Sequence, residues 1–149
     1  MCLLKSALRN LARLRPAPAD PRHRDGRRAE REALRLLRAQ GLALVARNVR
    51  NRWGELDLIM RDGPVLVVVE VRWRAGTAAG GAAASIGPAK QARLWRCTQR
   101  WLAGLPWPPP TVRFDVVLFE AGRPRWLRDA LQPPVHIASQ HLHGRRRSR

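Results

Sequence analysis

Three carboxylates in the middle of the chain have the spacing of a cation site. Glu55 and Asp57 alternate along one predicted strand and so share a face, and Glu70 and Arg72 do the same on the next strand. Carboxylates that converge from neighbouring strands repel one another, and a hard divalent cation is the usual resolution. The alternative is a set of ion pairs in which arginines neutralise Asp57 and Glu70. Spacing alone leaves both interpretations open.

The hydrophobic periodicity predicts the elements that position these side chains. The expected helices are 27–40 and 88–102, and the expected strands are 42–49, 55–60, 65–72, 111–119 and a short extended segment within 125–131. The run from Val65 to Val69 is apolar on both faces, which favours a central strand covered on both sides. The element order predicts an α/β fold with a mixed central β-sheet flanked by helices.

Composition at the two ends predicts one folded domain between two tails. Residues 1–25 are basic and rich in proline, which favours a disordered arm, and residues 132–149 end in arginines and favour a disordered basic tail. The domain is expected at 26–131, with a flexible Gly/Ala-rich loop over 74–85. The first residues lack a long secretory apolar region, and the two cysteines form no disulfide framework, so we expect a cytoplasmic protein.

The net charge makes nucleic acid the leading class of partner. The chain has 29 Lys and Arg against 11 Asp and Glu, for a formal charge of +18. We expect no membrane partner, because no apolar run reaches the roughly 18–20 residues of a spanning helix. The alternative is that codon usage in a GC-rich genome produced the arginines. The expected nucleic-acid contacts are Arg47, Arg50, Arg52 and Arg74 around the carboxylates, and Arg93, Arg96 and Arg100 along the second helix.

Several ordered motifs resemble one protein family. Gly54-Glu55-Leu56-Asp57-Leu58-Ile59, a hairpin turn, and Val69-Glu70-Val71-Arg72-Trp73-Arg74 resemble the core motif of the YraN family. These are uncharacterised, mostly bacterial, restriction-endonuclease-like proteins, similar in fold to archaeal Holliday-junction resolvases. Further matches in order are Gly26-x-x-Ala29-Glu30-x-x-Ala33, Asn48-x-Arg50, Lys90 and Arg113-Phe114-Asp115-Val116-Val117. The resemblance covers roughly residues 26–131.

The resemblance implies a PD-(D/E)xK nuclease site. Asp57, Glu70 and the carbonyl of Val71 would hold Mg²⁺ or Mn²⁺, and Glu30 would be a third acidic contributor. Such a metal activates water for attack on a phosphodiester and neutralises charge in the transition state. Branched DNA is the substrate that the resemblance suggests, and it leaves a homodimer open.

The chain departs from the family pattern at Arg72, which stands where the motif has lysine. A lysine there can orient and help deprotonate the attacking water, whereas arginine keeps its proton and can only stabilise charge. Three interpretations stay open. Metal-driven chemistry persists weakly with arginine, or Lys90 on the following helix serves instead, or the domain binds without cutting.

The sequence therefore predicts a metal-dependent DNA endonuclease and leaves two alternatives. The first is a catalytically silent DNA- or RNA-binding domain that retains the nuclease-like fold. The second is a basic protein-interaction module. Trp53 and Trp73 lie beside the expected site, where they could stack on unpaired bases or simply pack under a loop.

Overall fold

The computed structural model describes residues 21–74, 86–106 and 111–132. Most of the expected arm, the Gly/Ala-rich loop after residue 74 and the expected tail from residue 133 lie outside these ranges. The side chains of residues 21–25 and of Arg74 are also outside the description. No helix within the described ranges is long and apolar enough to cross a bilayer.

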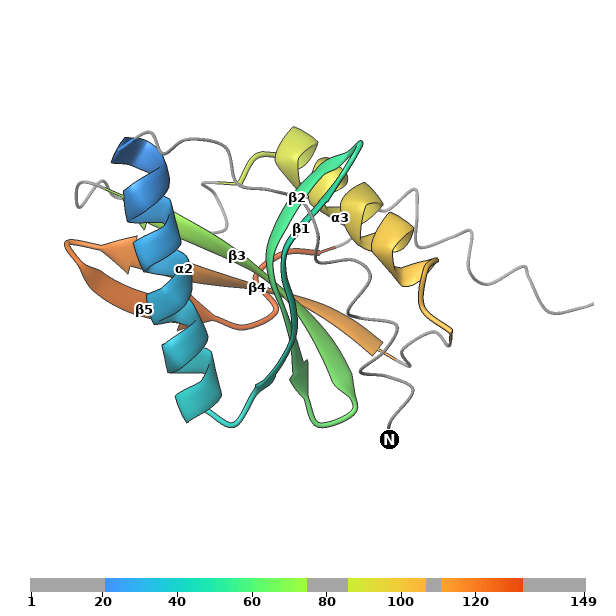
Figure 1. The fold of residues 1–149 in the computed structure, drawn as a ribbon, viewed down its shortest axis with the longest axis horizontal. Coiled ribbons are helices and arrows are strands. Elements are labelled where there is room, and N and C mark those ends of the chain that lie inside the picture. Colours follow the sequence, from blue (N-terminus) through green and yellow to red (C-terminus); the bar gives the residue numbers. More distant parts are fainter. Residues whose placement is uncertain (1–20, 75–85, 107–110, 133–149) are drawn as a thin grey trace, which may run out of the picture.

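A five-stranded mixed sheet forms the centre of the fold (Figure 1). Its strands are β1 (Ala43–Asn51), β2 (Gly54–Asp62), β3 (Val65–Arg74), β4 (Thr111–Glu120) and β5 (Arg123–Leu127). The order in the sheet follows the order in the chain. Neighbouring strands are antiparallel except β3 and β4, which are parallel and therefore need a crossover connection. The predicted mixed sheet is confirmed.

Within the described residues, one helix covers each face of the sheet (Figure 1). Helix α2 (Pro21–Ala39) buries Ala33 and Leu37 against one face, where Val69 of β3 belongs to the same core cluster. Helix α3 (Pro88–Leu102), which lies in the crossover, buries Leu94 and Trp101 against the other face. The chain thus forms the α/β fold with flanking helices that its periodicity predicts, and β3 is covered on both sides.

The β2–β3 hairpin turns tightly at Gly63 and Pro64. Gly63 has a φ of 57°, and the proline ring holds the next φ negative, which is the sign pattern of a type II′ turn. This turn sets the register, which pairs Asp62 with Val65 and continues to Leu58 opposite Val69. Because the register places Glu70 next to the last paired residue, the turn fixes where the two candidate carboxylates meet.

Several element boundaries differ from the prediction. Helix α2 begins at Pro21 rather than at residue 27, so it takes in the end of the expected arm, and proline suits a first helical turn. Strand β1 continues to Asn51. Strand β5 covers 123–127 rather than 125–131, because the chain turns at Asp129, which has a φ of 49°.

Candidate active site

Strands β2 and β3 separate where the candidate carboxylates begin. The paired register ends at Leu58 opposite Val69. One step further, Asp57 Oδ2 accepts a hydrogen bond from the backbone N–H of Val71 at 2.8 Å. The carboxylate accepts from a backbone N–H that has no partner on the neighbouring strand, and this contact holds Asp57 where the two strands part. We call this place, with Asp57 and Glu70, the fork.

Glu70 lies on the side of the sheet that α3 covers, and its residue is only 5% exposed. Lys90, in the first turn of α3, pairs with Glu70 Oε1. Arg72, two residues along the same strand face, places Nη1 3.7 Å from that oxygen. A buried carboxylate is costly without partners, so two cations at one oxygen offset that cost. Lys90 therefore reaches the site, as one of the three sequence interpretations requires.

The geometry of α3 explains why Lys90 faces the sheet. At about 100° per residue, Lys90, Leu94 and Trp101 fall within roughly 40° of one another around the helix axis. Leu94 and Trp101 pack in the core, so Lys90 lies on the same core-facing stripe at its amino-terminal end. The stem of Lys90 can then lie along the helix–sheet interface while its ammonium meets Glu70.

Asp57 carries the largest electrostatic perturbation in the site. Burial, and after it the nearby charge of Glu70, raise the pKa of Asp57 to about 7. The Val71 N–H and the charge of Lys90 act against the rise, while Glu30 adds to it. Burial and the neighbouring carboxylates thus both disfavour the charged form of Asp57.

Glu30 approaches this charge from the opposite face of the sheet. It lies half-buried on α2, and its charge contributes to the raised pKa of Asp57. Burial also raises the pKa of Glu30, with the charge of Glu55 second, whereas a hydrogen bond from Asn48 lowers it. Glu30 is therefore an electrostatic neighbour of the site, and its predicted role as a metal ligand stays a prediction.

The donors at the fork suit a hard cation. Over the ranges that the structure describes, no three His, Cys, Asp or Glu side chains come together as a metal-binding group. Asp57 and Glu70 do lie close enough for their charges to interact, and the backbone N–H of Val71 contacts Asp57. Magnesium commonly takes only one or two protein carboxylates, with water and substrate phosphate completing its shell. The oxygen donors of Asp57 and Glu70 fit such an ion.

Glu55 belongs to an ion pair rather than to the fork. Its Oε1 lies 3.0 Å from Arg50 Nε on the paired strand, and this pair is largely exposed. Glu55 therefore partly neutralises Arg50, one of the predicted nucleic-acid contacts.

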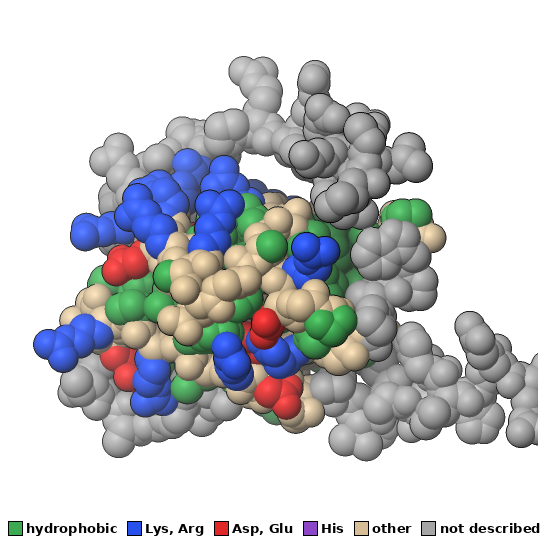
Figure 2. Space-filling view, turned by 90° about the horizontal axis from the view of Figure 1, so that it is seen from below, with side chains coloured by type: hydrophobic (Ala, Val, Ile, Leu, Met, Phe, Trp, Pro, Cys, Tyr) green, Lys and Arg blue, Asp and Glu red, His purple; other side chains and the backbone are tan. Residues whose placement is uncertain are grey.

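Basic side chains spread over the surface of the domain. Figure 2 shows Lys and Arg side chains gathered densely at one side of the face in view, with few acidic side chains among them. The predicted contact residues that are exposed are Arg47, Arg50, Arg52, Arg93, Arg96 and Arg100. Such a surface attracts polyanions at long range.

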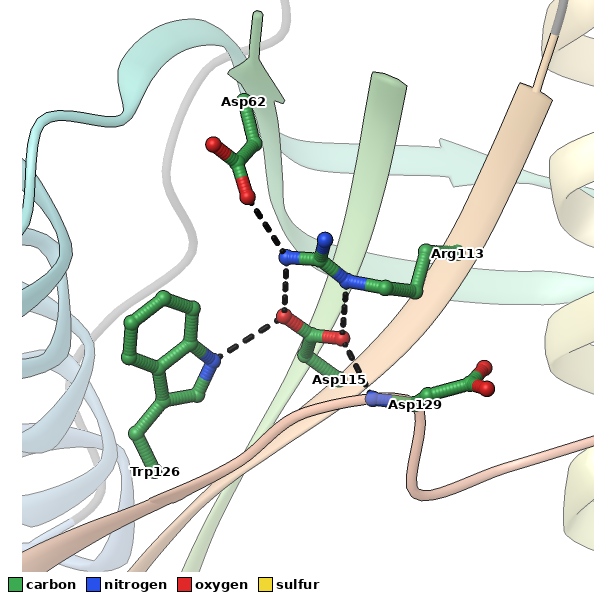
Figure 3. Close-up of polar contacts among 5 residues, drawn as sticks. All are labelled: Asp62, Arg113, Asp115, Trp126 and Asp129. Atoms are coloured by element: carbon green, nitrogen blue, oxygen red, sulfur yellow. Dashed lines mark hydrogen bonds and ion pairs between the residues drawn. The ribbon is translucent and has the colours of Figure 1, made fainter.

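A buried ion network was missed by sequence reasoning (Figure 3). Asp115, fully buried in β4, accepts hydrogen bonds from Arg113 Nε and Nη2 at 2.9 and 3.0 Å, from Trp126 Nε1 at 3.0 Å and from the Asp129 N–H at 2.9 Å. Arg113 also reaches Asp62 at 3.1 Å. The network joins β2, β4 and β5, so its role is structural. An aspartate inside an apolar strand was the available signal.

Comparison with known proteins supports the resemblance seen in the sequence. The model of "Uncharacterised protein family UPF0102" matches residues 29–119. A UPF0102 protein of Bordetella avium is 68% identical over 130 residues, which cover 87% of this chain and 90% of that protein. A UPF0102 protein of Alkalilimnicola ehrlichii is 52% identical over 123 residues, which cover 82% of this chain and 98% of that protein.

Proposed function

We propose that this chain, which belongs to the uncharacterised protein family UPF0102, is a divalent-metal-dependent nuclease that hydrolyses phosphodiester bonds in DNA. The observation that carries the proposal is the pair of carboxylates, half-buried Asp57 and buried Glu70, held in a fork between two strands with Lys90 and Arg72 against Glu70. This arrangement combines oxygen donors for a cation with positive charge for a phosphate.

Each side chain at the fork has a distinct task in this proposal. Asp57, Glu70 and the carbonyl of Val71 would hold the cation, which supplies charge neutralisation and an activated water. Lys90 orients the attacking water, because its ammonium can release a proton, whereas the guanidinium of Arg72 cannot. Arg72 contributes positive charge toward the phosphate.

Lys90 thus compensates for the arginine at the motif position. It reaches the same carboxylate oxygen as Arg72 but comes from the crossover helix instead of the strand. General acid–base assistance of this kind contributes about 10²- to 10⁴-fold to a rate. Substitution of Lys90 should therefore cost far more activity than substitution of Arg72.

A catalytically silent DNA-binding domain is the second candidate. It is favoured by the same ion pairs, because Lys90 and Arg72 neutralise Glu70 without any metal. In that case the fork would be a structural feature, and only the basic surface would act.

Cleavage of labelled duplex, single-stranded and four-way-junction DNA in Mn²⁺ separates the two candidates. We expect Glu70→Ala to abolish cleavage, Lys90→Met to lower it by about 10²-fold or more, and Arg72→Lys to raise it. Glu55→Gln is the matched control, because it removes a carboxylate of the same hairpin that lies outside the fork. Binding without cleavage by the wild type would contradict the nuclease proposal and favour the silent domain.

A further inference from the structure

The tip of the β1–β2 hairpin is fastened to the middle of α3. Asn51 Nδ2 donates to the Cys97 carbonyl at 3.0 Å, and its Oδ1 accepts from the Trp53 N–H at 2.9 Å. The Cys97 thiol donates to the Gly54 carbonyl at 3.5 Å. Cys97 is fully buried, so this attachment is anchored in the core. The hairpin tip and the helix therefore form one rigid surface.

Two arginines from different elements contact one tryptophan ring on this surface. The guanidinium carbon of Arg52 lies 4.9 Å from the centroid of Trp53, and that of Arg96 lies 5.4 Å from it. Arg52 comes from the hairpin tip and Arg96 from α3, and both are exposed. Within the part of the chain that the structure describes, neither forms an ion pair with a carboxylate. We call Arg52, Trp53 and Arg96 the arginine clasp.

The arginine clasp suits a phosphate backbone better than a base. Each cation–π contact is worth about 0.5–1 kcal/mol at an exposed site and holds the guanidinium plane in place. A guanidinium held in this way can donate two parallel hydrogen bonds to a phosphate group, which gives it a strong preference for phosphate oxygens. The guanidiniums also occupy space over the Trp53 ring, which disfavours stacking of a base there.

Helix α3 connects the arginine clasp to the fork. Arg93, Arg96 and Arg100 lie within about 60° around the helix axis, on a flank next to the core-facing stripe of Lys90. At about 1.5 Å per residue, Arg96 is roughly 9 Å along the axis from Lys90. That distance equals roughly two to three steps of one DNA strand at 3.4 Å per step.

We propose that the arginine clasp binds the phosphodiester backbone of duplex DNA about two to three base pairs from the fork. The inference rests on the proposed function for DNA as the substrate, but not on cleavage. The clasp is preorganised by Asn51 and Cys97, so it binds without ordering two long side chains first.

Duplex binding as a function of salt tests this inference. Fluorescence anisotropy in EDTA measures Kd for a labelled 20-base-pair duplex, so that no cleavage occurs. We compare wild type with Arg52→Ala/Arg96→Ala and with Arg35→Ala/Arg38→Ala. The control pair removes the same charge from exposed positions on α2, which covers the other face of the sheet. A third variant, Asn51→Ala, keeps both arginines but releases the hairpin tip.

The slope of log K against log salt is negative, and each phosphate contact contributes about −0.9 to it. Loss of two contacts should therefore make the slope shallower by about 1.8. At 0.1 M salt this corresponds to a roughly 60-fold rise in Kd. The control pair should leave the slope near that of the wild type, and Asn51→Ala should raise Kd by a smaller factor. Equal slopes for the clasp and control pairs would overturn the inference. It would also be overturned if polyglutamate displaced the labelled duplex as well as unlabelled DNA does at the same concentration of charge.

The outcomes also separate this inference from the nuclease proposal. A reduced slope in the clasp pair with no cleavage by the wild type would support the clasp and contradict the nuclease. Cleavage that depends on Glu70, with an unchanged slope in the clasp pair, would support the nuclease and contradict the clasp. Circular dichroism of each variant confirms that a weaker affinity comes from a folded protein.

Discussion

Removing the charge of Asp57 should make the metal-free protein more stable at high pH. Burial raises the pKa of Asp57 from its ordinary value of 3.8 to about 7, so the folded state holds this proton more tightly than the unfolded chain does. For an acid whose native pKa is raised, stability is present at low pH and is lost as pH rises from the unfolded to the native value. Asp57→Asn keeps an oxygen that can accept from Val71 N–H while abolishing the titration.

The size of the effect follows from the width of that window. About three pKa units at about 1.36 kcal/mol each give roughly 4 kcal/mol over the full range from pH 4 to pH 7. Between pH 5 and pH 8, about two of those units remain, so the stability advantage of Asp57→Asn should grow by about 3 kcal/mol. The asparagine side chain can also change the free energy of unfolding by an amount that does not depend on pH, and this change cancels when the difference at pH 5 is subtracted from that at pH 8.

Urea unfolding in EDTA at pH 5 and pH 8 measures this difference. Glu55→Gln serves as control, because Glu55 forms an exposed ion pair worth at most about 1 kcal/mol. Adding Mg²⁺ at pH 8 should stabilise the wild type more than Asp57→Asn, by about 2.7 kcal/mol at one hundred times Kd. An Asp57→Asn advantage that is the same at both pH values would refute the electrostatic reasoning.

Three further substitutions test the fold around the site. Asp115→Asn places amide hydrogens against the donors that surround Asp115, so urea unfolding should show a loss of about 3–5 kcal/mol. Gly63→Ala forces a side chain into the left-handed conformation of the hairpin turn, and the midpoint of unfolding should fall by an amount equivalent to about 1–2 kcal/mol. Gly26→Ala should instead stabilise by about 0.5–1 kcal/mol, because Gly26 is helical and a Cβ there meets no atom within 4 Å; a loss of stability would contradict the open environment.

Local periodicity predicted most of the fold. The apolar run of β3 indicated a strand covered on both sides, and Pro88 indicated where α3 begins. The start of α2 was predicted six residues too late, because Gly26 and the arginines around it obscure the helical pattern. Propensity alone could not show that the helix continues back to Pro21.

The candidate site was predicted only as far as strand alternation reaches. The shared face of Glu70 and Arg72 follows from a period of two. The hydrogen bond from Val71 to Asp57 depends on where the β2–β3 pairing ends, and the contact of Lys90 depends on how α3 crosses the sheet. The Asp115 network and the arginine clasp join elements that are distant in the chain, so no local pattern reports them.

The contacts of Asp57 and of Glu70 differ in how far apart in the chain the two contacting residues are. Asp57 and Val71 come from one hairpin and are 14 residues apart, whereas Lys90 reaches Glu70 only through the crossover helix. Hairpins close in about 1–10 μs, and contacts that need longer loops form later. During folding the carboxylates therefore meet before their ammonium partner arrives. In the native protein, a local opening of α3 would withdraw Lys90 and leave the acidic half of the site intact.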